Sequence, residues 1–128
     1  MDTATKPLLI AIDDEQFYLD EIEYALDGHD IEYMPFLGPS AFEEKATDDD
    51  LARANLIVVD YDFRTCTAVD RDLVGYIRER FPDFRGKMVL LSLLDDFFED
   101  DDVVRKKFDA VLNKRDDLFW EKIQAYLH

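Results

Sequence analysis

The chain has 128 residues, with 31 acidic and 15 basic side chains and a formal net charge of −16. This length suits one domain, and a hydrophobic share of 48% is enough to build a core. An acidic surface repels phosphate backbones and anionic headgroups, which argues against direct binding to nucleic acid or to a membrane surface. Cys66 is the sole cysteine, so no intramolecular disulfide can form, and a cytoplasmic location is expected.

Short apolar runs recur along the chain, and most are apolar throughout, which is typical of strands buried on both faces. Polar and amphipathic stretches separate them, so each run predicts one strand. The runs lie at 8–12 (LLIAI), 31–36 (IEYMPF, the weakest), 56–59 (LIVV), 88–91 (MVLL) and 110–112 (AVL).

The stretches between these runs have the spacing of amphipathic helices. In the first, Leu19, Ile22 and Leu26 share a face, and Gly28 predicts the end of the helix. In the second, Ser40 and Glu43 form a predicted capping box behind Gly38 and Pro39. Three more apolar stripes consist of Leu73, Val74, Ile77 and Phe81 before Pro82; Phe97, Val104 and Phe108; and Leu118, Phe119, Ile123 and Leu127 after a cap at Asp116 or Asp117.

Strands and helices therefore alternate five times, which predicts a doubly wound α/β fold with a five-stranded parallel sheet. Short chains of this kind often have the strand order 2-1-3-4-5. In that order the switch point lies between strands 1 and 3, and ligands bind there at the carboxyl ends of the strands. One domain is expected to span residues 1–128.

Polar residues follow four of the predicted strands. Asp13 and Asp14 follow the first strand, Asp60 the third, Ser92 the fourth and Lys114 the fifth. Clustered carboxylates repel one another unless a cation lies among them, and oxygen ligands with open positions suit Mg²⁺. An aspartate can accept a phosphoryl group, while a metal, a lysine and a hydroxyl stabilise the charge of that group.

This set resembles the receiver domains of two-component response regulators, which have a flavodoxin-like fold. The resemblance covers nearly the whole chain. It implies that Asp60 is the phosphoacceptor and that Asp13 or Asp14, together with Asp60 and the backbone carbonyl of Asp62, binds Mg²⁺.

The same resemblance implies that Ser92 and Lys114 contact the phosphoryl group, which a histidine kinase or phosphotransfer protein would supply. The expected function is phosphorelay signalling rather than turnover of an external substrate. Because the sequence ends at His128, output is expected through a separate downstream protein, and a homodimer is left open.

Two alternatives stay open. Leu93, Val111 and Arg115 differ from the residues usual in receivers, and these differences favour a pseudo-receiver that binds proteins without being phosphorylated. The segment 60–63 (DYDF) is similar to the Asp-x-Asp motif of haloacid-dehalogenase-type phosphatases, although that motif normally follows the first strand.

Overall fold

The computed structural model describes residues 6–60, 73–92, 108–113 and 119–127. The strands are β1 (Leu8–Asp13), β2 (Glu32–Leu37), β3 (Ala54–Asp60), β4 (Lys87–Ser92) and β5 (Ala110–Asn113). The helices are α1 (Gln16–Leu26), α2 (Pro39–Lys45), α3 (Asp48–Arg53), α5 (Leu73–Arg80) and α8 (Phe119–Leu127). Within the described ranges helices separate the strands, with two helices between β2 and β3, while residues 93–107 between β4 and β5 lie outside the described part.

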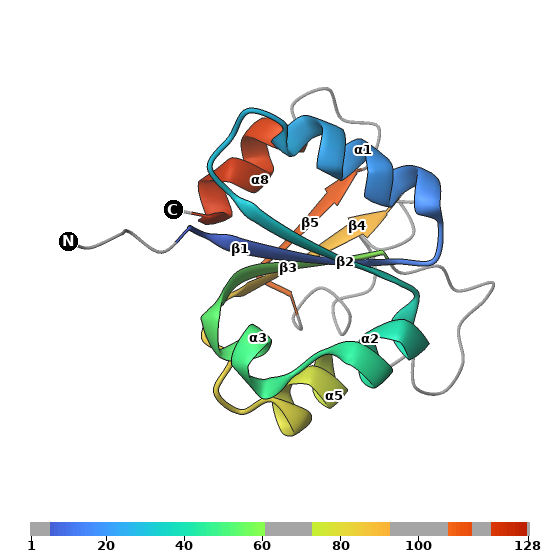
Figure 1. Cartoon of the computed structure of the whole chain (residues 1–128), viewed down its shortest axis with the longest axis vertical. Coiled ribbons are helices and arrows are strands. Elements are labelled where there is room, and N and C mark those ends of the chain that lie inside the picture. The colour runs from blue at the N-terminus through green and yellow to red at the C-terminus, as the bar shows by residue number, and fades with distance from the viewer. Residues whose placement is uncertain (1–5, 61–72, 93–107, 114–118, 128) are drawn as a thin grey trace.

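The five strands form one parallel sheet in the order β2-β1-β3-β4-β5, which confirms the predicted fold class and strand order. Helices α1 and α8 cover one face of the sheet, and α2, α3 and α5 cover the other (Figure 1). The sheet is therefore the middle layer of three, and its central strands are buried on both faces.

Successive residues of the central strands pack into two separate cores. Along β1, Leu8, Ile10 and Ile12 join the core under α2, α3 and α5, while Leu9 and Ala11 join the core under α1 and α8. This alternation is the period of two of an extended strand, and both sides are apolar because helices cover both faces. The helical stripes enter the same cores: Leu19, Ile22, Leu26, Ile123 and Leu127 on one side, and Ile77 and Phe81 on the other.

Two glycines determine how the first helices begin and end. Gly28 has a φ of 84° after α1, which fits the predicted stop. Gly38, with a φ of 89°, is the N-cap of α2. The predicted capping box was wrong, because Pro39 already begins the helix and Ser40 lies inside it, with no side-chain cap hydrogen bond.

The sequence reasoning missed a second short helix, α3. Thr47 is its N-cap, and the hydroxyl of Thr47 accepts a hydrogen bond of 3.2 Å from the backbone N–H of Asp50. Three aspartates fill the first turn, where the helix dipole favours negative charge. The signal was therefore present in the sequence as a threonine followed by acidic residues.

Strand β2 is an edge of the sheet, and a proline interrupts its free side. The backbone N–H groups of Glu32 and Gly38 point to β1, where they donate to the carbonyls of Pro7 and Asp13. By alternation, residues 33, 35 and 37 direct their nitrogens away from β1. Pro35 therefore costs no hydrogen bond inside the sheet and removes a donor from the middle of the exposed edge.

Strand β3 begins with a bulge at Asn55. Leu8 pairs with Ala54 and Leu9 with Leu56, so Asn55 is an extra residue. Its side-chain Oδ1 accepts a hydrogen bond of 3.0 Å from the N–H of Leu8, which replaces the missing backbone partner. Gly86 lies against this bulge: a Cβ atom on Gly86 would be 2.6 Å from the carbonyl oxygen of Asn55.

Candidate functional site at the carboxyl edge of the sheet

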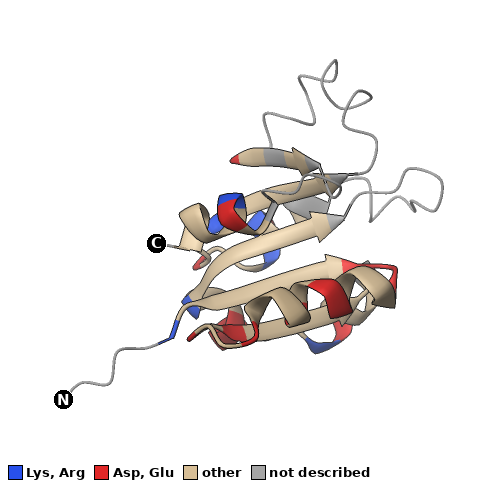
Figure 2. Ribbon diagram, turned by 90° about the horizontal axis from the view of Figure 1, so that it is seen from above, with Lys and Arg blue, Asp and Glu red and all other residues tan. Residues whose placement is uncertain are grey.

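The carboxyl ends of β1, β3 and β4 bring three of the predicted site positions, Asp13, Asp60 and Ser92, to one edge of the sheet. Ile12 of β1 pairs with Val59 of β3, so one further step along both strands sets Asp13 beside Asp60. Asp60 itself pairs with Leu91 of β4, and Ser92 follows. Figure 2 shows the strand arrows pointing to one side, with acidic residues directly after β1. Neighbouring strands are roughly 4.8 Å apart, so these backbone positions lie close together at one edge of the sheet.

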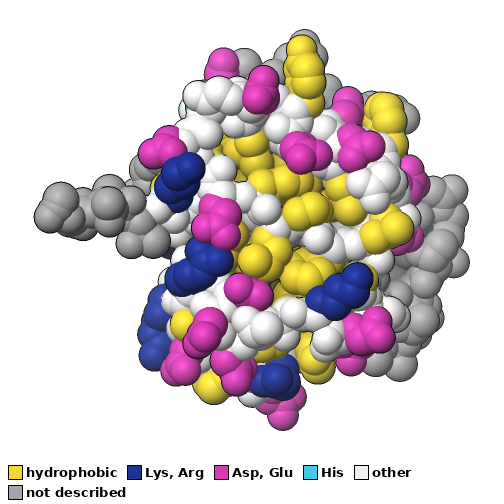
Figure 3. All heavy atoms as spheres, viewed as in Figure 1, with side chains coloured by type: hydrophobic (Ala, Val, Ile, Leu, Met, Phe, Trp, Pro, Cys, Tyr) yellow, Lys and Arg dark blue, Asp and Glu magenta, His cyan; other side chains and the backbone are white. Residues whose placement is uncertain are grey.

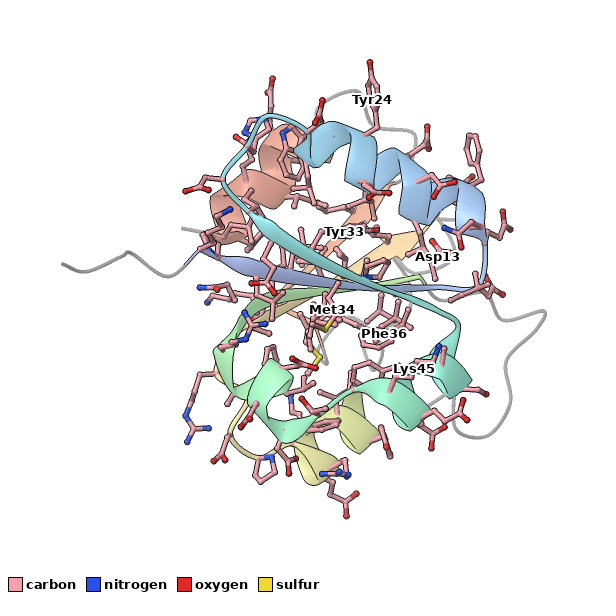
Figure 4. The ribbon with its side chains drawn as sticks, viewed as in Figure 1. Asp13, Tyr24, Tyr33, Met34, Phe36 and Lys45 are labelled. Carbon is pink, nitrogen blue, oxygen red and sulfur yellow. The ribbon has the colours of Figure 1, made fainter. Side chains whose placement is uncertain are left out.

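Asp13 is a buried acid at this edge, with 3% of its surface exposed. Its Oδ1 accepts a hydrogen bond of 2.9 Å from the backbone N–H of Glu15, which fixes the turn between β1 and α1. Figure 4 shows Asp13 at the end of β1, beneath the start of α1. Hydrogen bonds and cations both stabilise a buried carboxylate, so a cation is the kind of ligand that this position would accept.

Tyr33 lies on the same face of the sheet beneath α1 (Figure 4), and nearby negative charges affect the pKa of its hydroxyl. Its hydroxyl donates a hydrogen bond of 2.8 Å to the carbonyl oxygen of Leu19. Burial, followed by the negative charges of Glu23, Asp13 and Asp20, raises the pKa of Tyr33. The space under α1 therefore has a negative potential even without a contribution from Asp60.

The other predicted site residues are described to different degrees. Asp14 is exposed in the turn after β1. Asp60 and Ser92 are described as the last residues of β3 and β4, while their side chains lie outside the described part, as do Asp62 and Lys114. Among the side chains that are described, no group of three His, Cys, Asp or Glu residues could hold a metal ion.

The donors at this edge fit a magnesium ion in their chemistry. The buried carboxylate of Asp13, the exposed carboxylate of Asp14 and a third aspartate one strand away are hard oxygen ligands. Mg²⁺ prefers such ligands and retains open positions for water or phosphate oxygens. The cation would also offset the cost of burying Asp13.

Solved structures of response regulator receivers share this fold. A receiver protein from Pseudoalteromonas atlantica matches with a TM-score of 0.73 at 13% identity, covering 94% of this chain and 97% of its own. One from Pseudomonas putida matches with a TM-score of 0.69 at 19% identity over 98% of both chains. The response regulator TrrA of Thermotoga maritima, solved in complex with Mg(2+)-BeF, matches with a TM-score of 0.70 at 16% identity over 94% and 98%.

The chain therefore has the fold of a response regulator receiver domain over about 95% of its length. No family model matches the sequence, and no curated protein matches it significantly. Of the helices that the structure describes, none is long and apolar enough to cross a membrane.

Proposed function

We propose that the chain is a receiver that accepts a phosphoryl group on Asp60 and signals by binding another protein. The observation that carries this proposal is the register of β1 and β3, which aligns Asp60 with the buried Asp13 at the carboxyl edge of a receiver fold. In the transfer, a carboxylate oxygen of Asp60 bonds to phosphorus while the bond between phosphorus and the donor breaks, and the donor leaves with the electron pair.

Magnesium is the proposed cofactor, held by the carboxylates of Asp13, Asp14 and Asp60 and the backbone carbonyl of Asp62. When bound, it would neutralise charge on the transferred group. Asp13 has little freedom to move, because it is buried and its Oδ1 is bound to the N–H of Glu15. This chain would therefore supply one rigid and one exposed carboxylate on β1, and Asp60 one strand away.

Ser92 and Lys114 are proposed to complete the phosphoryl site. Ser92 is the last residue of β4, and Lys114 directly follows β5, so both belong to strand ends of the same edge. A hydroxyl and an ammonium group there would donate hydrogen bonds to phosphoryl oxygens. The proposed phosphodonor is a histidine kinase or a phosphotransfer protein, and the output is a downstream protein that prefers the phosphorylated form.

The test is labelling with acetyl phosphate and Mg²⁺, followed by intact-protein mass measurement. Wild type should gain one phosphoryl group, Asp60→Asn should gain none, and Asp62→Asn should still be labelled. Chelation of Mg²⁺ should abolish labelling of the wild type. Asp62→Asn is the matched control, since it makes the same chemical change two residues away.

Each failure of this experiment has a definite meaning. A wild type that stays unlabelled while a control receiver is labelled would establish the pseudo-receiver alternative. A label that survives Asp60→Asn would show that another residue is the acceptor. Continued hydrolysis of a phosphate ester in excess over protein would instead favour the phosphatase alternative.

A further inference from the structure

The opposite edge of the sheet has a pocket whose charged lining, among the residues that the structure describes, is basic. It lies at the amino ends of β3 and β4 and has a volume of about 480 Å³. Its charged lining residues are Arg53, Arg85 and Lys87. Acidic residues outnumber basic ones by 31 to 15 in the whole chain, yet none of the described residues that line this pocket is acidic. In Figure 3 several Lys and Arg side chains lie toward the left, the side from which the strands start, with Asp and Glu side chains among them.

We propose that this pocket binds a small molecule bearing phosphate or carboxylate groups. Pockets of roughly 300–1,000 Å³ suit small molecules, and convergent charged groups define what they bind. Sequence inspection could not find this site, because Arg53 and Arg85 are 32 residues apart and meet only through the pairing of β3 with β4.

Existing ion pairs leave most of the basic charge available. Arg53 is already neutralised, because its guanidinium donates two hydrogen bonds of 2.9 and 2.8 Å to Glu32 and also lies 3.8 Å from the carboxylate of Asp50. Arg85 donates from Nη1 to the neutral carbonyl of Pro82, at 2.8 Å. Neither Arg85 nor Lys87 pairs with a carboxylate in the part of the chain that the structure describes.

Two helix ends oppose anion binding here, but they are weaker than the side chains. Helix α3 ends at Arg53, and the described part of α8 ends at Leu127, which also lines the pocket. A helix C-terminus carries roughly half a negative elementary charge. Two such ends offset about one cation, so recognition of an anion here would rest on direct hydrogen bonds from Arg85 and Lys87.

Asn55 adds a neutral hydrogen-bond donor at the same place. Its Oδ1 is committed to the backbone N–H of Leu8, so its amide NH₂ group faces away from that contact. Asn55 is exposed and lines the pocket together with Tyr126. An amide, a guanidinium and an ammonium form a donor set for an oxyanion, and Tyr126 adds an aromatic surface for the remainder of the ligand.

The probes for the test are pyrophosphate and citrate, which distinguish phosphate from carboxylate ligands. Each is titrated into the full chain after divalent metal ions have been removed with a chelating resin, so that Mg²⁺ cannot bring anions to the acidic edge and no other carboxylate competes with the probe. Amide NMR shifts should change at Asn55, Gly86 and Tyr126 and saturate. The affinity should fall about tenfold in Lys87→Gln and in Arg85→Gln, because each loses a charge-assisted hydrogen bond.

The matched control is Lys45→Gln, which removes an exposed cation of α2 that does not line the pocket. It should leave the affinity unchanged, and melting curves should show that all variants are folded. The proposal is overturned if chloride at matched ionic strength gives the same shifts, or if the double variant at Arg85 and Lys87 binds both probes as wild type does. Shifts centred on Asp13 rather than Gly86 would overturn it equally.

Discussion

Replacing Gly86 by alanine should destabilise the protein even though Gly86 lies outside the helices and strands. An added Cβ would lie 2.6 Å from the carbonyl oxygen of Asn55 and 2.7 Å from that of Ala54. Both atoms belong to the backbone of the bulged start of β3, so no side chain can rotate away to relieve the contact. Overpacking of this kind costs about 1–3 kcal/mol.

The expected change is large enough to measure by melting and by denaturant unfolding. For a domain of this size, 1 kcal/mol corresponds to roughly 3–5 °C in Tm, so Gly86→Ala should lower the Tm by about 3–15 °C. The denaturant m-value should stay unchanged, because the substitution strains the native state and does not alter the surface exposed on unfolding.

Gly28 provides a control in which backbone strain, rather than a steric clash, should destabilise the variant. Nothing lies within 4 Å of a Cβ there, but the φ of 84° disfavours side chains. Gly28→Ala should therefore cost about 1 kcal/mol through backbone strain, and Gly28→Asn less, because asparagine tolerates this conformation. At Gly86 the order should reverse, with asparagine at least as damaging as alanine. A Gly86→Ala variant within about 0.5 kcal/mol of wild type would refute the steric reasoning.

Two further predictions concern β2. Pro35→Val should restore a donor to the exposed edge and increase self-association in sedimentation runs at equal concentration; unchanged sedimentation would contradict the edge-blocking role. Burial raises the pKa of the Tyr33 hydroxyl, so Tyr33 loses its proton at a lower pH in the unfolded protein than in the folded protein. The contribution of Tyr33 to stability is therefore complete below about pH 10, the unfolded pKa, and is lost as the pH rises further. Tyr33→Phe should therefore weaken the alkaline loss of stability, whereas Tyr24→Phe, at a residue 85% exposed, should not.

Apolar patterning predicted most of the fold. The runs at 8–12, 56–59 and 88–91 correspond to strands whose two sides enter different cores, which is why they lack alternation. The strand boundaries in the structure differ from the predicted ones by one or two residues, because polar residues such as Asp13 and Lys87 still pair within the sheet. The helix expected around Phe97 and Val104 lies outside the described residues.

Predictions of which residue caps the N-terminus of a helix were less reliable. Ser40 and Glu43 have the spacing of a capping box, but Gly38 with its positive φ takes the cap position. Thr47 followed by acidic residues could have predicted α3. Apolar periodicity did not indicate this short helix, because Leu51 is its buried residue. The acidic strand ends were predictable as a group, since in a parallel sheet every carboxyl end lies at the same edge.

The two edges of the sheet differ in a way that only the assembled fold reveals. Asp13 and Asp14 lie at the carboxyl edge, whereas Arg85 and Lys87 lie beside the amino end of β4. Parallel strands keep these groups a strand length apart, about 20 Å for six residues, which is beyond the roughly 8–10 Å over which salt leaves surface charges coupled. Anions at one edge and Mg²⁺ at the other should therefore bind without direct electrostatic coupling, so the proposed pocket and the proposed phosphorylation site can be tested separately.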